Sequence, residues 1–406
     1  MGQSTLDVAV IGAGIGGLAA AVALDRAGIA AVVFEQAPKL RETGAGIHLA
    51  PNGSRILARW GLTEQLEAGG AVRPELLEVR AYGSGQVLAR QPMGAAWAER
   101  FGGTHYTLHR ADLHAVLVGA LGADRIRLGR RCTEVAQDAE GVTVRFADGA
   151  AHRAQVVIGA DGVHSLLRAA RAADDLPCHS GSAALRGVVP AGRAPALAAD
   201  RLYLWVGPAA RLLVCPTGGG RDLAFVAVVP EAAPAAGGGE SWSRTSTREA
   251  LLEALAGIEP QARALAEAAT EVGHWSLFDR EPLASWSEGR TTLLGDAAHP
   301  ILPHHGQGAS QALEDAVALA HCLAGVRDGG DPGAVEKALR AYEQVRLPHT
   351  GGVHAATREG GSQKLAPAQG AGHGAPQERR MQAMTEAADA AQLYDIHEHL
   401  GAAPSF

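Results

Sequence analysis

The chain of 406 residues has little cysteine and no cluster of basic side chains. The few cysteines stand far apart, which excludes a disulfide framework and the short spacings of zinc ligands; they are Cys132, Cys178, Cys215 and Cys322. Free thiols are typical of a reducing compartment, so the sequence predicts a cytoplasmic protein. The net charge of −7 argues against a nucleic-acid partner. An uncharged run over residues 8–24 is too short for a membrane span and is interrupted by glycines.

The start of the chain carries a glycine pattern between two apolar runs. Residues 7–11 lead into Gly-x-Gly-x-x-Gly at Gly12, Gly14 and Gly17, and an alanine-rich helical pattern follows. A second apolar run then ends at Glu35. This order of strand, tight turn, helix and acid is typical of a dinucleotide site, in which the acid binds a ribose hydroxyl. An acid at this place, in preference to arginine, favours FAD or NAD over NADP.

The rest of the chain indicates an α/β protein with a second sheet inserted into it. Apolar, strand-like runs separated by turns fill much of the region from 177 to 230, and strand-then-acid patterns recur before and after it. We predict a Rossmann-like first part over 1–175, a mixed or mostly antiparallel substrate-binding sheet over 176–272, and a return to the first domain over 273–348. Residues 349–406 are predicted to form a C-terminal helical segment.

Two later motifs join the first: Gly159-Ala160-Asp161-Gly162 and Gly295-Asp296-Ala297-Ala298-His299-Pro300. The three together resemble the single-component FAD-dependent aromatic hydroxylases, the group A flavoprotein monooxygenases with the para-hydroxybenzoate hydroxylase fold. The segments 44–48 and 302–309 are similar to the branch of salicylate hydroxylase and 6-hydroxynicotinate 3-monooxygenase. No second Gly-x-Gly-x-x-Gly is present, so NAD(P)H would bind without a Rossmann domain of its own, as in this family.

The resemblance implies a set of FAD contacts. Gly12, Gly14, Gly17 and Glu35 would bind the ADP half, and Arg110 would reach the pyrophosphate and ribityl region. Asp161 matches a motif that touches FAD and the transient NADH or NADPH, and Asp296 matches one on the ribityl or pyrophosphate side. Flavin-ring contacts would come from the turn at Gly46 and from Pro303, Gly306 and Gly308. The helix after Gly308 would direct its N-terminus at the negative charge of reduced flavin.

The resemblance also implies the reaction. NAD(P)H reduces FAD, O₂ adds to give a flavin C4a-hydroperoxide, and its terminal oxygen goes to an electron-rich ring of a small phenolic or hydroxy-heteroaromatic substrate. If a carboxylate stood ortho to the hydroxyl, the reaction would include decarboxylation. His48 and His304 are the candidate catalytic residues, because histidine titrates near neutrality. Arg186, Tyr203 and Cys215 are candidate substrate contacts, Arg186 because it can pair with a carboxylate; each of the five could also be an ordinary packed or surface residue.

Three alternatives stay open at this point. The same fold could hydroxylate or epoxidise a larger natural product, could act as an NAD(P)H oxidase that makes only peroxide, or could bind flavin in a regulatory role without turnover. The sequence departs from the family pattern at Pro216, where an aromatic is typical, and at Ala224, where an asparagine is typical. We expect a monomer or homodimer with a small aromatic substrate and no membrane partner.

Overall fold

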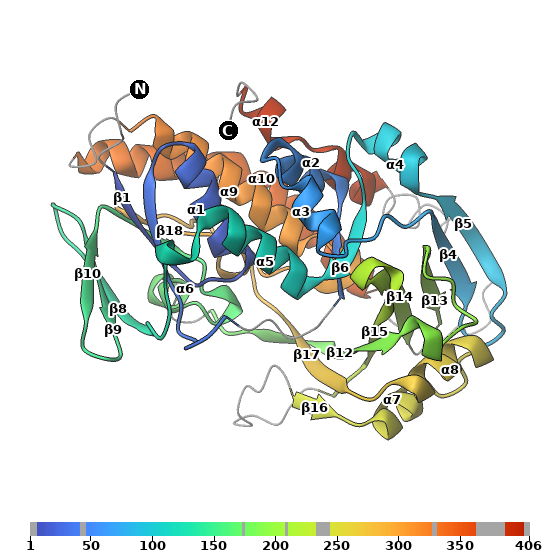
Figure 1. The fold of residues 1–406 in the computed structure, drawn as a ribbon. Coiled ribbons are helices and arrows are strands. Elements are labelled where there is room, and N and C mark those ends of the chain that lie inside the picture. Colours follow the sequence, from blue (N-terminus) through green and yellow to red (C-terminus); the bar gives the residue numbers. More distant parts are fainter. Residues whose placement is uncertain are drawn as a thin grey trace.

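The computed structural model describes residues 6–40, 46–172, 175–207, 210–232, 244–326, 331–362 and 386–401. Much of the predicted C-terminal helical segment, at 363–385 and 402–406, lies outside these residues. The described part contains a nucleotide-binding unit and a large second sheet beside it, as Figure 1 shows. This arrangement confirms the predicted fold class.

A parallel five-stranded sheet forms the centre of the nucleotide-binding unit, in the order β18-β11-β1-β2-β7. Its strands are almost entirely apolar, as expected of parallel strands that are covered on both faces. They are β1 (Asp7–Ile11), β2 (Ala30–Phe34), β7 (Ile126–Arg127), β11 (Val156–Gly159) and β18 (Thr291–Leu293). The sheet therefore brings together strands from three distant parts of the chain.

Helices from both ends of the chain cover this sheet. The first, α1 (Ile15–Arg26), packs against α9 (Gly308–Ala324) and α5 (Arg110–Leu121), and α9 in turn contacts α10 (Pro332–Ser362). Alanines in α1, buried from Ala19 to Ala23, allow this close helix packing. The unit also includes the shorter helices α2 (Pro51–Arg59), α3 (Thr63–Ala68), α6 (Leu166–Arg171) and α12 (Ile396–His399).

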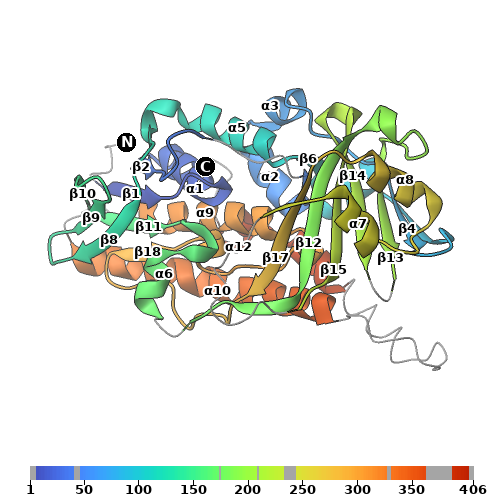
Figure 2. The same ribbon diagram turned by 90° about the horizontal axis from the view of Figure 1, so that it is seen from below.

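The second sheet has eight strands in the order β16-β17-β12-β15-β14-β13-β4-β5, and all neighbours are antiparallel except β13 and β4. Its strands are β4 (Leu76–Ala81), β5 (Val87–Pro92), β12 (Cys178–Pro190), β13 (Arg201–Val206), β14 (Arg211–Thr217), β15 (Asp222–Pro230), β16 (Arg244–Ser246) and β17 (Val272–Asp279). Two of them, β4 and β5, come from well before residue 176. Figure 2 shows the sheet standing beside the nucleotide-binding unit.

The two faces of the eight-stranded sheet bury different partners. One face packs on α7 (Arg248–Ala254) and α8 (Pro260–Ala268), where Trp205, Phe225 and Leu251 share a core. The other face carries Cys215 and Ala224, which pack with Trp97 of α4 (Gly94–Phe101). The second face is the one that meets the nucleotide-binding unit.

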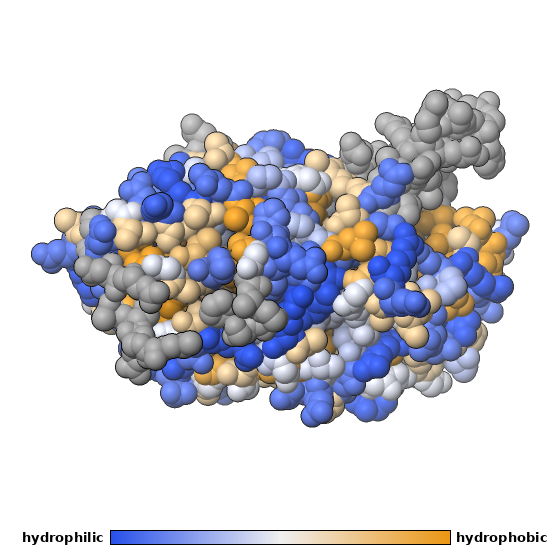
Figure 3. Space-filling view, turned by 90° about the horizontal axis from the view of Figure 1, so that it is seen from above, coloured by the Kyte–Doolittle hydropathy of each residue, from blue (hydrophilic) through white to orange (hydrophobic). Residues whose placement is uncertain are grey.

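Two small sheets complete the described structure. A ribbon of β3 (Gly46–Leu49) and β6 (Tyr106–His109) is antiparallel, and so is a three-stranded sheet of β8 (Cys132–Gln137), β9 (Val142–Phe146) and β10 (Ala151–Ala154). None of the helices in the described ranges has the length and apolar character that a membrane crossing needs. Hydrophilic residues cover much of the face in Figure 3, with hydrophobic ones in small groups between them.

Candidate active site

The glycine loop after β1 is built so that only glycine fits at two of its positions. Gly12 has φ of +105°, and a Cβ there would lie 2.4 Å from the carbonyl oxygen of Ala160. A Cβ at Gly17 would lie 2.0 Å from the carbonyl oxygen of Gly12. At Gly14, by contrast, the nearest atom to such a Cβ is Nη2 of Arg110, at 3.9 Å. The loop thus keeps the N-terminal end of α1 open beside a guanidinium, which fits a pyrophosphate.

Glu35 follows β2 and is tied to the glycine loop. Its Oε2 accepts a hydrogen bond from the backbone N–H of Ala13 at 2.9 Å, and its Oε1 accepts one from Ala37 at 2.8 Å. Each carboxylate oxygen keeps a further lone pair for a ligand. The acid therefore lies where a ribose next to the pyrophosphate would need an acceptor.

Arg110 and Asp296 approach the same region from different elements. Burial lowers the pKa of the Arg110 guanidinium, and the charge of Asp296 opposes this effect. The protein around Asp296 removes part of the hydration of its carboxyl and so raises the pKa, although the residue keeps solvent-exposed surface. A carboxylate that is enclosed yet reachable suits a bound polar ligand such as the ribityl chain of FAD.

Asp161 lies two residues after the end of β11, at the same end of the parallel sheet. Its Oδ2 accepts a hydrogen bond from the backbone N–H of Leu166 at 2.8 Å. Its Oδ1 is buried and has no hydrogen-bond partner among the described residues. Burial raises the pKa of this carboxyl. An orphaned buried oxygen here is consistent with a missing ligand group.

The loop before α9 lies against β3. It contains the single turn η6 (Pro303–His305) and then Gly306, whose φ is +63°. A Cβ at Gly306 would lie 3.2 Å from the Cβ of His48 on β3. His304, in η6, is half-buried and Pro303 is exposed. The structure thus brings the two segments that the resemblance places at the flavin ring next to each other.

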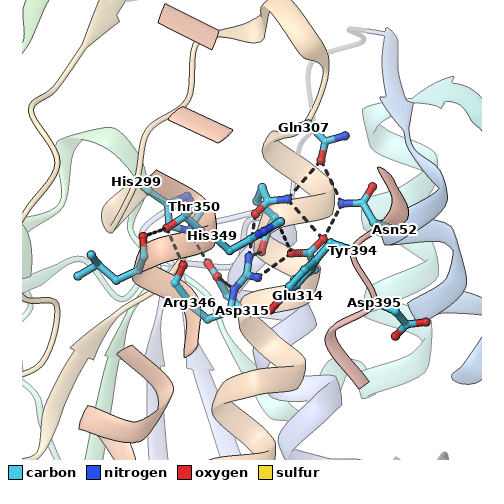
Figure 4. Close-up of polar contacts among 12 residues, drawn as sticks. Asn52, His299, Gln307, Glu314, Asp315, Arg346, His349, Thr350, Tyr394 and Asp395 are labelled. Atoms are coloured by element: carbon cyan, nitrogen blue, oxygen red, sulfur yellow. Dashed lines mark hydrogen bonds and ion pairs between the residues drawn. The ribbon is translucent and has the colours of Figure 1, made fainter. Parts of the chain in front are cut away.

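The first turns of α9 rest on a buried polar network, which Figure 4 shows. Asp315 accepts hydrogen bonds from the backbone N–H of Gly295 at 3.0 Å and from Nε of Arg346 at 2.7 Å, and its Oδ2 lies 2.6 Å from Nε2 of His299. These contacts connect the turn that carries Asp296 to α9 and α10. Burial would raise the pKa of Asp315, but nearby charges, including that of Arg346, lower it to about 2, so the carboxyl is ionised.

Glu314 forms the second half of this network. Its carboxylate lies 2.7 Å from Nη1 of Arg346 and accepts a hydrogen bond from Nδ2 of Asn52 at 2.6 Å. The same Asn52 amide also donates to Oε1 of Gln307, the residue just before α9, at 3.0 Å. Burial raises the pKa of Glu314 to about 7. Our sequence reasoning missed these residues; the adjacent acids inside an otherwise apolar helix were the available signal, because buried carboxylates need a partner.

Arg186 lies on β12, on the sheet face that meets the nucleotide-binding unit, since its strand neighbour Ala184 packs with Leu302. Burial and the charge of Arg110 lower the pKa of its guanidinium to about 10. Within the described ranges no carboxylate pairs with it, and its buried Nε has no hydrogen-bond partner. Its guanidinium carbon lies 5.3 Å from the ring centre of Trp275. A half-buried cation without a counter-charge destabilises the protein, and an anionic ligand would supply that charge.

The other two predicted substrate contacts lie on opposite faces of the sheet. Cys215 is on the face of Arg186, 3.4 Å from where a Cβ on Gly46 would stand, and burial raises the pKa of its thiol to about 12. Tyr203 is on the face that packs on α7 and α8, where its ring stacks on that of Trp205. Its hydroxyl oxygen accepts a hydrogen bond from the backbone N–H of Ala198 at 2.9 Å. Because side chains alternate along a strand, Tyr203 points away from Arg186. We therefore leave Tyr203 out of the candidate site.

His48 faces a second histidine that the sequence did not single out. Its Nδ1 lies 3.1 Å from Nε2 of His105, which precedes β6 on the other side of the ribbon. Burial lowers the pKa of His48 to about 4 and that of His105 to about 3. Both rings are therefore neutral at pH 7. A value near 4 lies below the near-neutral one that general-base catalysis would favour.

Known proteins match most of the chain. Residues 5–357 match the family model described as "FAD binding domain". The 3-amino-4-hydroxybenzoate 2-monooxygenase of Streptomyces cremeus is 42% identical over 354 residues, 86% of each chain. The 6-hydroxynicotinate 3-monooxygenase of Bordetella bronchiseptica is 40% identical over 343 residues, 84% of this chain and 87% of that one. The crystal structure of Klebsiella pneumoniae HpxO with FAD and uric acid matches with a TM-score of 0.80 at 29% identity, over 98% of this chain and 96% of that one.

Proposed function

The chain belongs to the FAD-dependent aromatic monooxygenases, and from this membership we propose that it hydroxylates a small hydroxy-aromatic acid with NAD(P)H and O₂. FAD is its cofactor. Relatives at 36% identity or more are named for aminohydroxybenzoate, hydroxynicotinate and hydroxybenzoate, each a ring that carries both a carboxylate and an oxygen substituent. When bound, FAD supplies electron transfer from the nicotinamide and activation of O₂.

The observation that supports an acid as substrate is the state of Arg186. It is a half-buried guanidinium without a carboxylate partner in the described part of the chain, and it lies on the sheet face that meets β3. A substrate carboxylate would pair with it in bidentate fashion, and the two charge-assisted hydrogen bonds would offset the hydration that the carboxylate loses. His48 would then meet the ring hydroxyl from the other side, with His304 and Cys215 as further candidate contacts.

The remaining candidate residues are proposed to hold FAD. The open backbone at Gly14 and the guanidinium of Arg110 would bind the pyrophosphate, with Gly12 and Gly17 shaping the loop. Glu35 would accept a hydrogen bond from the ribose hydroxyl. Asp161 and Asp296 would accept hydrogen bonds from the nicotinamide cofactor or from the ribityl chain of FAD. The segment that contains Gly46, Pro303, Gly306 and Gly308 would lie along the ring system, where the N-terminus of α9 stabilises negative charge.

We also propose that the enzyme works in the cytoplasm as a monomer or homodimer. All four cysteines are free in the structure, which suits a reducing compartment. The net charge of −7 gives no support to a nucleic-acid partner. Size-exclusion chromatography with light scattering tests the oligomeric state directly.

The test of the function is turnover by purified, FAD-loaded protein. NADH and NADPH oxidation should be followed with hydroxybenzoates, hydroxynicotinates and the matching carboxamides, and oxygenated product should be compared with peroxide. We expect an acid to accelerate reduction and to appear as hydroxylated product, while its carboxamide does neither. Peroxide without oxygenated product for every acid would overturn the proposal in favour of an oxidase. A large phenolic that outperforms all acids would move the substrate to a natural product.

A further inference from the structure

The pair formed by His48 and His105 has an unsatisfied polar atom at each end. The two rings share one contact, Nδ1 of His48 to Nε2 of His105 at 3.1 Å. The outer nitrogens, Nε2 of His48 and Nδ1 of His105, are sealed from solvent and have no hydrogen-bond partner in the described part of the chain. The two rings meet edge to face, with centres 5.4 Å apart. Such orphaned atoms are rare in native proteins and call for a ligand or a functional reason.

The surroundings of the pair keep it neutral. Burial alone lowers the pKa of His48, and for His105 burial acts together with the other imidazole. No carboxylate or guanidinium of the described residues contributes to either shift. The packed neighbours are instead the indole of Trp97, 6.4 Å from the His105 ring centre, and the backbone of Gly306 beside His48. Each ring therefore carries one proton, and only one of the two facing nitrogens can donate.

That restriction leaves two arrangements of the protons. In the first, His48 donates from Nδ1, so its Nε2 is a bare acceptor and His105 is left with an orphaned Nδ1–H. In the second, His105 donates from Nε2, so His48 carries its proton on Nε2 and His105 is left with a bare acceptor. Buried N–H groups without a partner are rarer than under-satisfied acceptors. Once a ligand engages Nε2 of His48, the second arrangement is the one that leaves no orphaned donor.

We propose that His105 is a positioning residue which fixes His48 as a neutral N–H donor to the oxygen of the bound substrate. The inference rests on the proposed function for the identity of that oxygen, a ring hydroxyl that ionises on the enzyme. In this role His48 stabilises the oxyanion by a hydrogen bond and takes no proton from it. A neutral imidazole can polarise an oxygen in this way when its environment keeps it from charging. The phenol proton leaves to solvent before or during binding, so no proton enters the pair.

The first test needs a bound ligand but no turnover, so 4-hydroxy-3-nitrobenzoate is added as its phenolate. The holoprotein is labelled with ¹⁵N at the histidine rings, and two-bond correlation spectra assign the tautomers of His48 and His105 by loss of signals in the His48→Gln and His105→Gln variants. We expect both rings as neutral Nε2–H tautomers from pH 8 down to about pH 5. A His48 ring protonated at Nδ1, or a charged imidazolium at pH 7, would overturn the proposal. This result stands whether or not the enzyme oxygenates any phenol.

The second test measures the ionisation of a bound phenol. With 4-hydroxy-3-nitrobenzoate as the probe, the phenolate absorbance of the complex is titrated against pH for wild type, His105→Phe and His105→Gln. The phenylalanine variant loses the donor to Nδ1, and we expect the acid dissociation constant of the bound phenol to fall about tenfold, the effect of a charged hydrogen bond. The glutamine variant can still donate from its amide, and its value should stay within about threefold of wild type, with the probe's dissociation constant little changed.

His152→Phe is the matched control, because this histidine packs on Phe34 in the nucleotide-binding unit, with ring centres 4.9 Å apart. It should leave the phenol titration unchanged. Equal values for wild type and His105→Phe, or equal losses in the phenylalanine and glutamine variants, would show that His105 does not position His48. If the probe fails to bind wild type, the substrate assignment is in error and the proposal about His105 falls with it.

Discussion

Replacing Arg186 by methionine should make the substrate-free enzyme more stable and its binding of acids weaker. Burial and the charge of Arg110 bring the pKa of the guanidinium from 12.5 to about 10. At about 1.4 kcal/mol per pKa unit, the folded protein pays about 3 kcal/mol to keep this side chain charged. The contact with Trp275 offsets about 1 kcal/mol. The variant should therefore gain about 2 kcal/mol, which corresponds to a rise in Tm of about 2 °C for a chain of this length.

The sign of the effect sets the conditions of the assay. A base whose pKa is lowered on folding destabilises the protein at every pH below its folded value, and the loss disappears as the pH rises from about 10 toward 12.5. Melting curves at pH 7.5 thus report the full difference. In the same buffer, difference spectra of FAD should show that the dissociation constant of an aromatic acid rises between about tenfold and a hundredfold in the variant.

Arg201→Met is the matched control, since Arg201 pairs with the neighbouring Asp200 at the start of β13 in the same sheet. It should change neither Tm nor acid affinity by a measurable amount. The reasoning about Arg186 would be refuted by a variant that melts below wild type without ligand and binds acids as well as wild type does. That pair of results would make Arg186 an ordinary structural residue.

Three further changes test other parts of the site. Glu35→Ala should weaken FAD binding by about tenfold, measured as flavin released on dialysis, because the glycine loop loses its carboxylate anchor; full retention would argue against the ribose role. Glu314→Gln should flatten the dependence of Tm on pH, because an acid whose pKa rises to about 7 on folding costs stability progressively as the pH increases from 4.5 to 7; parallel curves for both proteins would contradict this. Gly46→Ala should destabilise the enzyme by about 1–3 kcal/mol in urea titrations, because the new Cβ would lie 2.3 Å from that of Ala224. Gly28→Ala is the control: its Cβ would meet open space, so any loss of stability there comes from the backbone strain at φ of +74° and not from crowding.

The local parts of the fold were predictable from the sequence. The glycine pattern at Gly12–Gly17 and the acid at Glu35 predicted a strand, a helix and a second strand, and β1, α1 and β2 lie there. Each of these elements is specified by neighbours within a few residues, so a short window contains the necessary information. The apolar runs between residues 177 and 230 predicted the second sheet, which the structure contains. The family resemblance extended the prediction to FAD, which the comparisons confirm.

The relations between distant segments were not predictable in the same way. Residues 202–206 are apolar without alternation, so nothing showed that Tyr203 would face α7 and α8. His105 follows Gly102-Gly103-Thr104 and belongs to no motif in the sequence. Its contact with His48 depends on the register of β3 against β6, which the sequence does not reveal. Arg346 lies two residues before Pro348; proline usually interrupts a helix, yet α10 continues through Pro348 to Ser362. Its two buried acids occupy another helix, which only the tertiary fold brings near.

The pairing of α1 with α9 has a consequence for how the protein is made. The glycine loop leaves the ribosome well before β18 and α9, which complete its sheet and cover its helix and follow about 280 residues later. At roughly 5–20 residues per second, the interval is on the order of 15–60 s. During that time α1 can pack on β1, β2 and α5, but the side of the helix that α9 covers has no partner. We therefore expect the yield of active enzyme to change with translation speed and with chaperones that hold the unfinished first half of the sheet.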